Sequence, residues 1–101
     1  MSTSIWEDAA KSVHWYVEPG RVIDTDRAPF NRWFPDGTTN ACYNALDLHV
    51  AQGHEDRIAL IYDSPVTESK RSISYGELLQ TVSRFAGALT KLGVGKGDRV
   101  I

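Results

Sequence analysis

Hydrophobic residues repeat with helical spacing most clearly between residues 75 and 92 of this chain. The apolar positions lie three and four residues apart: Leu78, Leu79, Val82, Phe85, Ala86, Leu89 and Leu92. Ser74 stands directly before the run and Glu77 three residues further on, which is the spacing of a capping box. Gly93 follows the last apolar position and suits a helix end. The pattern predicts a long amphipathic helix.

Two further segments have weaker helical patterns. Residues 3 to 18 predict a helix that Ser4 and Glu7 would cap and Pro19-Gly20 would end, with its apolar positions at Ile5, Ala9, Val13 and Tyr16. Residues 40 to 52 predict another, capped by Thr39 or Asn40 and stopped by Gly53, with one stripe formed by Cys42, Ala45, Leu46, His49 and Val50.

Strand patterns lie between the second and third helices. Residues 57 to 62 are rich in Ile, Leu and Tyr, and residues 71 to 75 return after a polar loop at 63 to 70. We interpret the pair as a β-hairpin. The last three residues, 99 to 101, read as the start of a further strand.

Residues 19 to 39 have no clear periodicity. Pro29, Pro35 and Gly37 interrupt them, and three aromatic side chains stand among them. An irregular, aromatic-rich segment of this length is expected to lie over a protein surface larger than itself. We therefore expect residues 1–39 to be a lead-in helix and irregular segment. Residues 40–101 are then expected to be the first part of a larger α/β domain.

Composition and charge exclude several classes of function. The chain has 101 residues, with 11 basic and 13 acidic side chains and a net charge of −2, which argues against nucleic-acid binding. No apolar run approaches the ~20 residues of a membrane span, and the first residues lack the apolar stretch of a secretory signal. These features predict a cytoplasmic location.

The residues best suited to chemistry do not form a recognisable site. His14, His49 and His54 follow no metal-binding spacing, and Asp47 and His49 lie two positions apart, on different faces of a helix. Cys42, the single cysteine, is expected to be a buried structural thiol because it lies on the apolar stripe of its helix.

The glycine-rich string GVGKGD, residues 93 to 98, resembles a phosphate-binding loop at first sight. A phosphate loop follows a strand and opens a helix, whereas these glycines close a helix and lead toward a strand. We interpret them as cap and turn residues. We therefore assign no catalytic, cofactor-binding or metal-binding residue to this chain from its sequence.

Three strings resemble short-chain acyl-CoA synthetases of the adenylate-forming superfamily. They are WFPDGTTNACYNALDLHV at 33 to 50, SISYGELLQTV at 72 to 82 and LGVGKGDRVI at 92 to 101. The last two are similar to sequences across the superfamily, and the first narrows the resemblance to the acetyl- and propionyl-CoA synthetases. Its Thr-Asn-x-Cys-Tyr-Asn-Ala stretch is more similar to the propionyl enzymes. Leu48 departs from the family, which commonly has Arg at this position.

The resemblance implies that this is the N-terminal fragment of an adenylate-forming α/β enzyme, containing three helices, a β-hairpin and the start of a further strand. The parent would use ATP, Mg²⁺ and CoA to convert a carboxylate into an acyl-adenylate and then a thioester, through groups that lie downstream of Ile101. The fragment alone would be inactive. Its partner would be the remainder of its own chain, and the isolated piece would self-associate.

Other hypotheses are compatible with the sequence. The acid could be acetate or acetoacetate instead of propionate, and the chain could be a free-standing interaction module. Within the fragment, we expect scaffold roles. Asn40, Asn44, Asp47 and His49 would tie the second helix to neighbouring loops, and Tyr75 and Glu77 would fix the start of the third.

Overall fold

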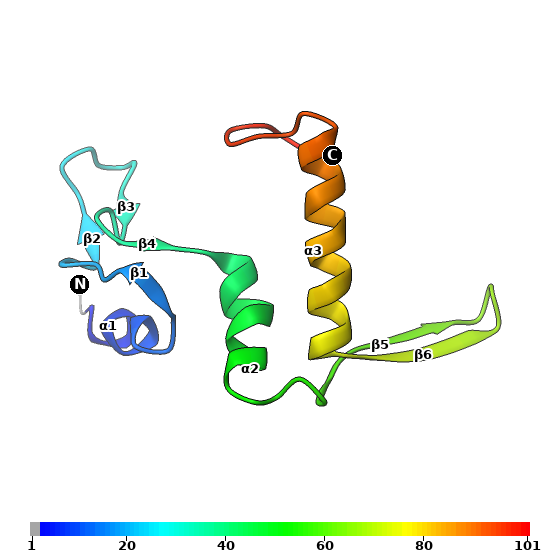
Figure 1. The fold of residues 1–101 in the computed structure, drawn as a ribbon. Coiled ribbons are helices and arrows are strands. Elements are labelled where there is room, and N and C mark those ends of the chain that lie inside the picture. The colour runs from blue at the N-terminus through cyan, green and yellow to red at the C-terminus, as the bar shows by residue number, and fades with distance from the viewer. Residues whose placement is uncertain (1–2) are drawn as a thin grey trace. The chain divides into compact units, whose positions relative to one another are not determined.

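The computed structural model describes residues 3 to 101 (Figure 1). The chain forms two compact units, one ending at Asn44 and the other beginning at Ala45. The boundary that the sequence predicts after residue 39 is a boundary between segments of the parent enzyme, and it stays a prediction. Residues 1 and 2 of the predicted first segment lie outside the described part.

The first unit contains one short helix and two small antiparallel sheets. Helix α1 spans Ser4–Ala10. Strand β1, Trp15–Val17, pairs with β4, Thr38–Thr39. Strand β2, Ile23–Asp24, pairs with β3, Arg32–Trp33. Three of these strands, β2, β3 and β4, lie in the segment from residue 19 to residue 39, in which the sequence showed no periodicity.

The helix expected over residues 3 to 18 is wrong in its second half. The chain leaves the helix after Ala10 and enters β1, whose Trp-Tyr-Val sequence favours a strand. The Trp15 indole Nε1–H donates to the carbonyl oxygen of Ala10 at 2.9 Å and so closes the turn between them. The expected cap is also wrong, because Thr3 occupies the N-cap position and its hydroxyl donates to the Glu7 carboxylate at 3.0 Å.

The second helical segment is present but not as a uniform α-helix. Asn40 caps it as expected, since its Oδ1 accepts the backbone N–H of Tyr43 at 2.9 Å. A π-helical turn, η1, covers Tyr43–Asp47, and α2 covers Leu48–Ala51. The wider turn keeps Leu46 inward, where it is 9% exposed.

The second unit contains the hairpin and the long helix that the sequence predicts. Strand β5, Ile58–Ser64, pairs antiparallel with β6, Ser69–Ser74, in a register that runs from Ile58 opposite Ser74 to Ser64 opposite Ser69. Helix α3 follows at once, over Tyr75–Lys91. Its predicted cap is confirmed, because Ser74 Oγ accepts the Glu77 backbone N–H at 3.2 Å. The Glu77 carboxylate pairs with Arg71 instead of completing the capping box.

The expected strand at residues 99 to 101 is not formed. The chain after α3 turns at Gly93 and Gly97, which have φ of 89° and 91°, and the final residues are irregular. A strand requires a neighbour for its backbone N–H and C=O groups. No strand among residues 3–101 supplies one for this segment.

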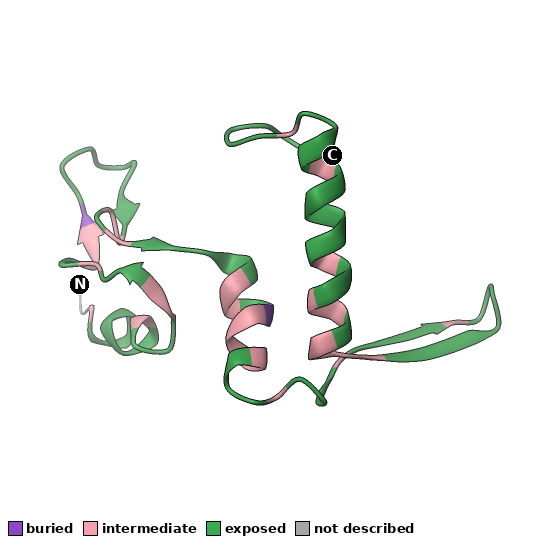
Figure 2. Ribbon diagram, viewed as in Figure 1, coloured by how far each residue is buried: buried purple, intermediate pink, exposed green. Residues whose placement is uncertain are grey.

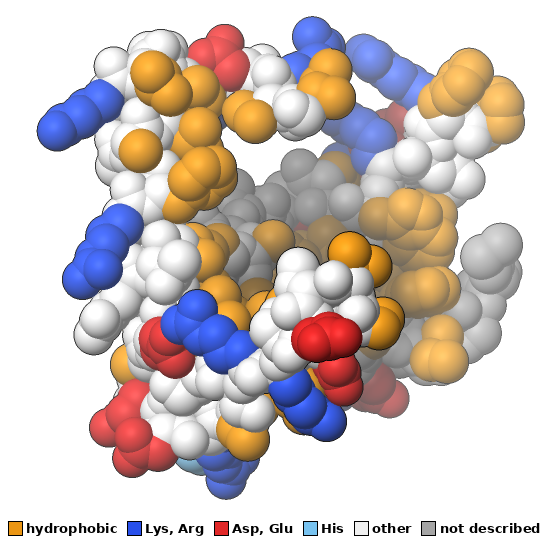
Figure 3. Space-filling model, turned by 90° about the vertical axis from the view of Figure 1, so that its right-hand side faces the viewer, with side chains coloured by type: hydrophobic (Ala, Val, Ile, Leu, Met, Phe, Trp, Pro, Cys, Tyr) orange, Lys and Arg blue, Asp and Glu red, His pale blue; other side chains and the backbone are white. Residues whose placement is uncertain are grey.

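Little of this chain is buried within itself. Among residues 3–101 only Leu46 and Asp24 fall in the buried class (Figure 2). Large apolar side chains are exposed on β5 and α3, including Ile61 at 61% and Phe85 at 63%. Figure 3 shows hydrophobic side chains at the surface among charged ones. Surfaces of this kind are suited to packing against further protein.

The Ser74 cap gives a first testable prediction. Ser74→Ala removes the acceptor for the Glu77 N–H and is expected to lower the free energy of unfolding by about 1 kcal/mol. Circular dichroism at 222 nm during urea unfolding measures the change. Ser72→Ala, on the exposed side of β6, is the matched control and should lose far less. Equal losses from both variants would contradict the capping role.

Candidate functional site

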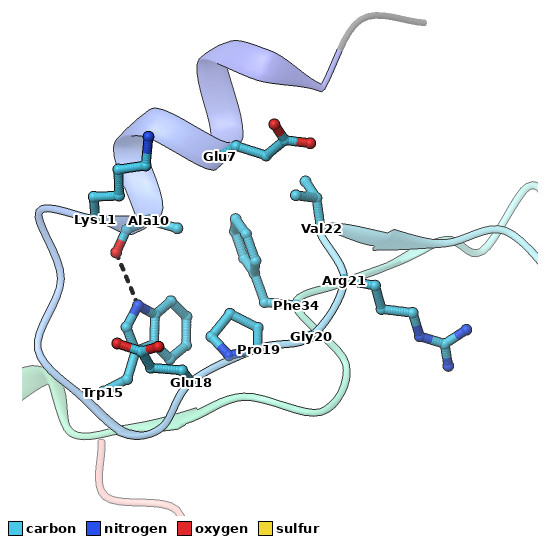
Figure 4. A pocket seen from close by; sticks show the side chains of 10 residues that line it. All are labelled: Glu7, Ala10, Lys11, Trp15, Glu18, Pro19, Gly20, Arg21, Val22 and Phe34. Carbon is cyan, nitrogen blue, oxygen red and sulfur yellow. Dashed lines mark hydrogen bonds between the residues drawn. The ribbon is translucent and has the colours of Figure 1, made fainter.

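A pocket of about 330 Å³ lies in the first unit (Figure 4). The end of α1, residue Trp15, the loop from Glu18 to Val22, and Phe34 line it. These segments are up to 27 positions apart in sequence (34 − 7), counting from Glu7 to Phe34. The two small sheets of this unit bring them together, because the pairing of β1 with β4 holds Trp15 and the pairing of β2 with β3 places Phe34 opposite Val22.

Two aromatic rings provide the apolar part of the pocket. The ring centroids of Trp15 and Phe34 lie 5.5 Å apart with their planes inclined by 54°. Phe34 has a positive φ of 46°, which is unfavourable for a bulky residue, and its backbone N–H donates to the carbonyl oxygen of Val22 at 2.8 Å. Figure 4 shows the Phe34 ring extending from the loop toward α1.

The four charged residues that line the pocket differ in whether they already have partners. Lys11 Nζ lies 2.7 Å from Asp8 Oδ1, and this hydrogen bond raises the pKa of the lysine. Arg21 reaches Asp24 at 3.4 Å, and Figure 4 shows its guanidinium pointing away from the pocket. Within residues 3–101, the carboxylate of Glu18 takes part in no ion pair or hydrogen bond, and that of Glu7 accepts only the Thr3 hydroxyl.

Asp24 anchors the loop between β2 and β3. Asp24 is 5% exposed, and its carboxylate accepts hydrogen bonds from the backbone N–H of Asp26 at 3.0 Å and from Nη2–H of Arg32 at 2.6 Å. The hydrogen bond from Asp26, followed by that from Arg32, lowers the pKa of Asp24. A carboxylate stabilised in its charged form thus fixes the loop that precedes Phe34.

This arrangement gives a pH prediction. The pKa of Asp24 is lower in the folded chain than in the unfolded chain. The charged carboxylate therefore stabilises the folded chain above about pH 4, and this contribution to the free energy of unfolding is lost as the pH falls through the folded pKa. Asp24→Asn should therefore be less stable than the native chain at pH 6, and the difference should shrink toward pH 2. Urea unfolding of both proteins across this range tests it, and a pH-independent difference would be the contrary result.

Asn44 ties the start of the helical segment to His14, the residue directly before β1, as the sequence led us to expect. Its Oδ1 accepts the backbone N–H of His14 at 2.7 Å. Its Nδ2 donates to the His14 carbonyl oxygen at 3.1 Å, to the Thr39 hydroxyl at 3.0 Å and to the Asn40 carbonyl oxygen at 2.9 Å. The side chains of Asp47 and His49, named for the same role, form no hydrogen bond within residues 3–101.

The histidines occupy separate environments. The His14 ring lies 4.7 Å from the Tyr43 ring and 5.8 Å from the Tyr16 ring, and its Nδ1 is buried without a hydrogen-bond partner. His49 lies 4.7 Å from the Tyr75 ring. In the described part of the chain, no three His, Cys, Asp or Glu side chains lie close enough together to hold a metal ion.

Cys42 corrects one expectation, because its side chain is exposed. The predicted stripe assumed regular α-helical spacing from Cys42 to Val50, and the π-helical turn changes which residues share a face. The glycine string lies after α3 in turns, as interpreted, and the Gly95 N–H donates to the Asp98 carboxylate at 2.7 Å.

Comparison with known proteins places the chain in a family. Residues 48–101, just over half of the chain, match the AMP-binding enzyme family, and the chain belongs to it. Residues 3–45 match a second family description, the N-terminus of acetyl-coenzyme A synthetase. Together the two matches identify the chain as an N-terminal segment similar to the acetyl-CoA synthetase-like short-chain acyl-CoA synthetases.

Individual relatives agree with this assignment. Mouse "Acyl-CoA synthetase short-chain family member 3, mitochondrial" is 47% identical over 96 residues, covering 95% of this chain. "Acetyl-coenzyme A synthetase" of Burkholderia mallei is 47% identical over 93 residues, and that of Streptomyces avermitilis 45% over 95. The chain spans about 14% of the length of each relative. No helix within residues 3–101 has the length and apolar character needed to cross a membrane.

Sequence reasoning did not find the pocket. Its parts lie in a segment without periodicity, and the only signal was the concentration of Trp and Phe around it. A second pocket, of about 530 Å³, was also missed. It lies in the second unit, where the start of α3 meets Val50, Glu55 and Asp56.

Proposed function

We propose that the parent of this chain is an ATP-dependent, AMP-forming short-chain acyl-CoA ligase that acts on propionate. The observation that carries the proposal is the order of the two family matches, acetyl-coenzyme A synthetase N-terminus over 3–45 and AMP-binding enzyme over 48–101. The preference for propionate rests on the stretch from Thr39 to Ala45, which resembles propionyl-CoA synthetases. Acetate and acetoacetate are the alternative acids.

Within the parent, this chain serves as scaffold. Its residues do not fit ATP, Mg²⁺ or CoA. The glycine string follows a helix instead of opening one, and one of its amides already donates to a carboxylate, Asp98, that would repel a phosphate. The described residues also bring together no set of metal ligands. We propose that all three groups bind elsewhere in the parent enzyme.

Measuring pyrophosphate release tests both parts of the proposal. The parent, supplied with ATP, Mg²⁺ and CoA, is expected to show its highest kcat/KM with propionate when propionate, acetate and acetoacetate are compared. The 101-residue chain should show no acid-dependent release. A higher kcat/KM for acetate would overturn the propionate assignment, and turnover by the isolated chain would overturn the scaffold role.

We further propose that the isolated chain self-associates. The β5–β6 hairpin forms a two-stranded sheet with an open edge on each strand, and Ile61 and Tyr62 are exposed at 61% and 47%. Sedimentation velocity should show dimers or larger species that grow with concentration, and Ile61→Lys should reduce them. A strict monomer at millimolar concentration would contradict this.

We also propose a cytoplasmic location for the parent. The mouse relative carries the word mitochondrial in its name. Fractionation of source cells distinguishes a cytoplasmic from a mitochondrial location, because the parent is then detected in the soluble or in the organellar fraction.

A further inference from the structure

We propose that the pocket of the first unit binds an organic cation with an alkylammonium head group. The pocket combines an aromatic surface, formed by Trp15 and Phe34, with the carboxylates of Glu7 and Glu18 (Figure 4). Nothing in the family assignment accounts for this combination, and the proposal is independent of the ligase activity.

The aromatic rings are the first step in the argument. The face of an aromatic ring carries partial negative charge and attracts a cation that lies within about 6 Å of its centroid. The indole N–H of Trp15 is already bonded to Ala10, so the polar edge of this ring is satisfied and its position is fixed. The Phe34 ring is held by a backbone with positive φ, which costs free energy and is a feature of binding sites.

The balance of charge is the second step. Lys11 is paired with Asp8, and Arg21 shares the Asp24 carboxylate with Arg32 while its guanidinium points away from the pocket. Neither Glu7 nor Glu18 forms an ion pair within the described residues, although the negative charge of Glu7 also acts on Lys11. The carboxylate of Glu18 therefore leaves a negative charge at the pocket that no ion pair among residues 3–101 compensates. An anion would be repelled, and a neutral apolar ligand would remove water from the carboxylates without replacing it.

The size of the pocket is the third step. A volume of about 330 Å³ is at the lower end for small-molecule sites and accepts a trimethylammonium group or the end of a lysine side chain. A free trimethylammonium compound and a lysine side chain of another protein both present an alkylated nitrogen cation. One experiment distinguishes these two kinds of ligand.

Titration of the full 101-residue chain tests the proposal. Choline is the cationic probe, and 3,3-dimethylbutan-1-ol is a neutral molecule of the same shape. The readout is the indole N–H signal in ¹H–¹⁵N spectra, because the chain has three tryptophans that report separately. We expect choline to shift the Trp15 signal most and to bind at least tenfold more tightly than the neutral probe, a difference of about 1.4 kcal/mol.

Variants locate the site. Glu18→Gln should weaken choline binding severalfold, and Phe34→Leu should weaken it further while keeping an apolar side chain. Glu55→Gln, which removes one negative charge in the second unit, is the matched control and should leave the affinity unchanged. Circular dichroism of each variant establishes that a loss of binding is not a loss of folding.

Every outcome of the titration is decisive. Equal binding of the two probes, or no Trp15 shift at tens of millimolar choline, would overturn the proposal, as would a Glu18→Gln variant that binds like the native chain. With cation binding established, the second probe is Nα-acetyl-lysine amide, which keeps the side-chain ammonium group. Tighter binding of this probe than of choline assigns the site to a protein side chain. The reverse order assigns it to a free small cation.

Discussion

Asn44→Ala is expected to lower the free energy of unfolding of the first unit by about 3 kcal/mol. The substitution removes four hydrogen bonds, of which the shortest, at 2.7 Å, satisfies the backbone N–H of His14. Each such bond contributes about 0.5–1.5 kcal/mol, and the partly buried His14 groups would be left without their partner. All three tryptophans precede Asn44, so tryptophan fluorescence during urea unfolding reports this unit.

Two neighbouring substitutions separate the contributions. Asn40→Ala removes only the acceptor for the Tyr43 N–H and should cost about 1 kcal/mol. Asn44→Asp keeps the acceptor for His14 but loses the donors, so its loss should lie between the other two. If Asn44→Ala cost no more than Asn40→Ala, the links from Asn44 to β1 would have no measurable role.

The sequence predicted the second unit well because its elements are long. Helix α3 covers 17 residues, enough for several repeats of the apolar pattern, and Ser74 marks its start with a specific hydrogen bond. The hairpin was also predicted, although β5 extends to Ser64 and β6 begins at Ser69, which shortens the loop. The residue pattern within each element favours the structure that it adopts, and the Ser74 cap adds to this for α3. Both elements can therefore be predicted without information from distant residues.

The first unit could not be predicted in the same way because distant residues determine it. Strands of two or three residues are too short to show alternation. The apolar pattern from Ile5 to Tyr16 favours a helix locally, yet the pairing of Trp15 with Thr39 turns the second half into a strand. The bond from Asn44 to the His14 backbone contributes to the same pairing. Such contacts override helix propensity.

The pocket was missed for the same reason. Trp15 and Phe34 are 19 positions apart (34 − 15), and only the folded backbone brings their centroids to 5.5 Å. By contrast, the family assignment needed no geometry, because three continuous strings carry it. Continuous motifs can be read from the sequence, whereas a surface assembled from separate loops requires the structure.

Gly37→Ala tests whether this assembled surface is as closely packed as the structure indicates. A Cβ at this position would lie 2.8 Å from Cζ3 of Trp15, closer than such atoms approach, and 3.1 Å from Cβ of Pro19, which is a tight contact. The indole cannot move away freely because its N–H is bonded to Ala10 at 2.9 Å. We expect a loss of about 2 kcal/mol in the free energy of unfolding, measured by tryptophan fluorescence in urea.

Gly87→Ala provides the matched control. A Cβ at Gly87 would meet nothing within 4 Å, and the residue lies inside α3, where Ala is favoured over Gly by about 1 kcal/mol. This variant should leave the tryptophan transition unchanged and raise the helical signal at 222 nm. If Gly37→Ala also left the tryptophan transition unchanged, Trp15 would be free to move. A mobile Trp15 could not provide the fixed aromatic surface that the cation pocket requires.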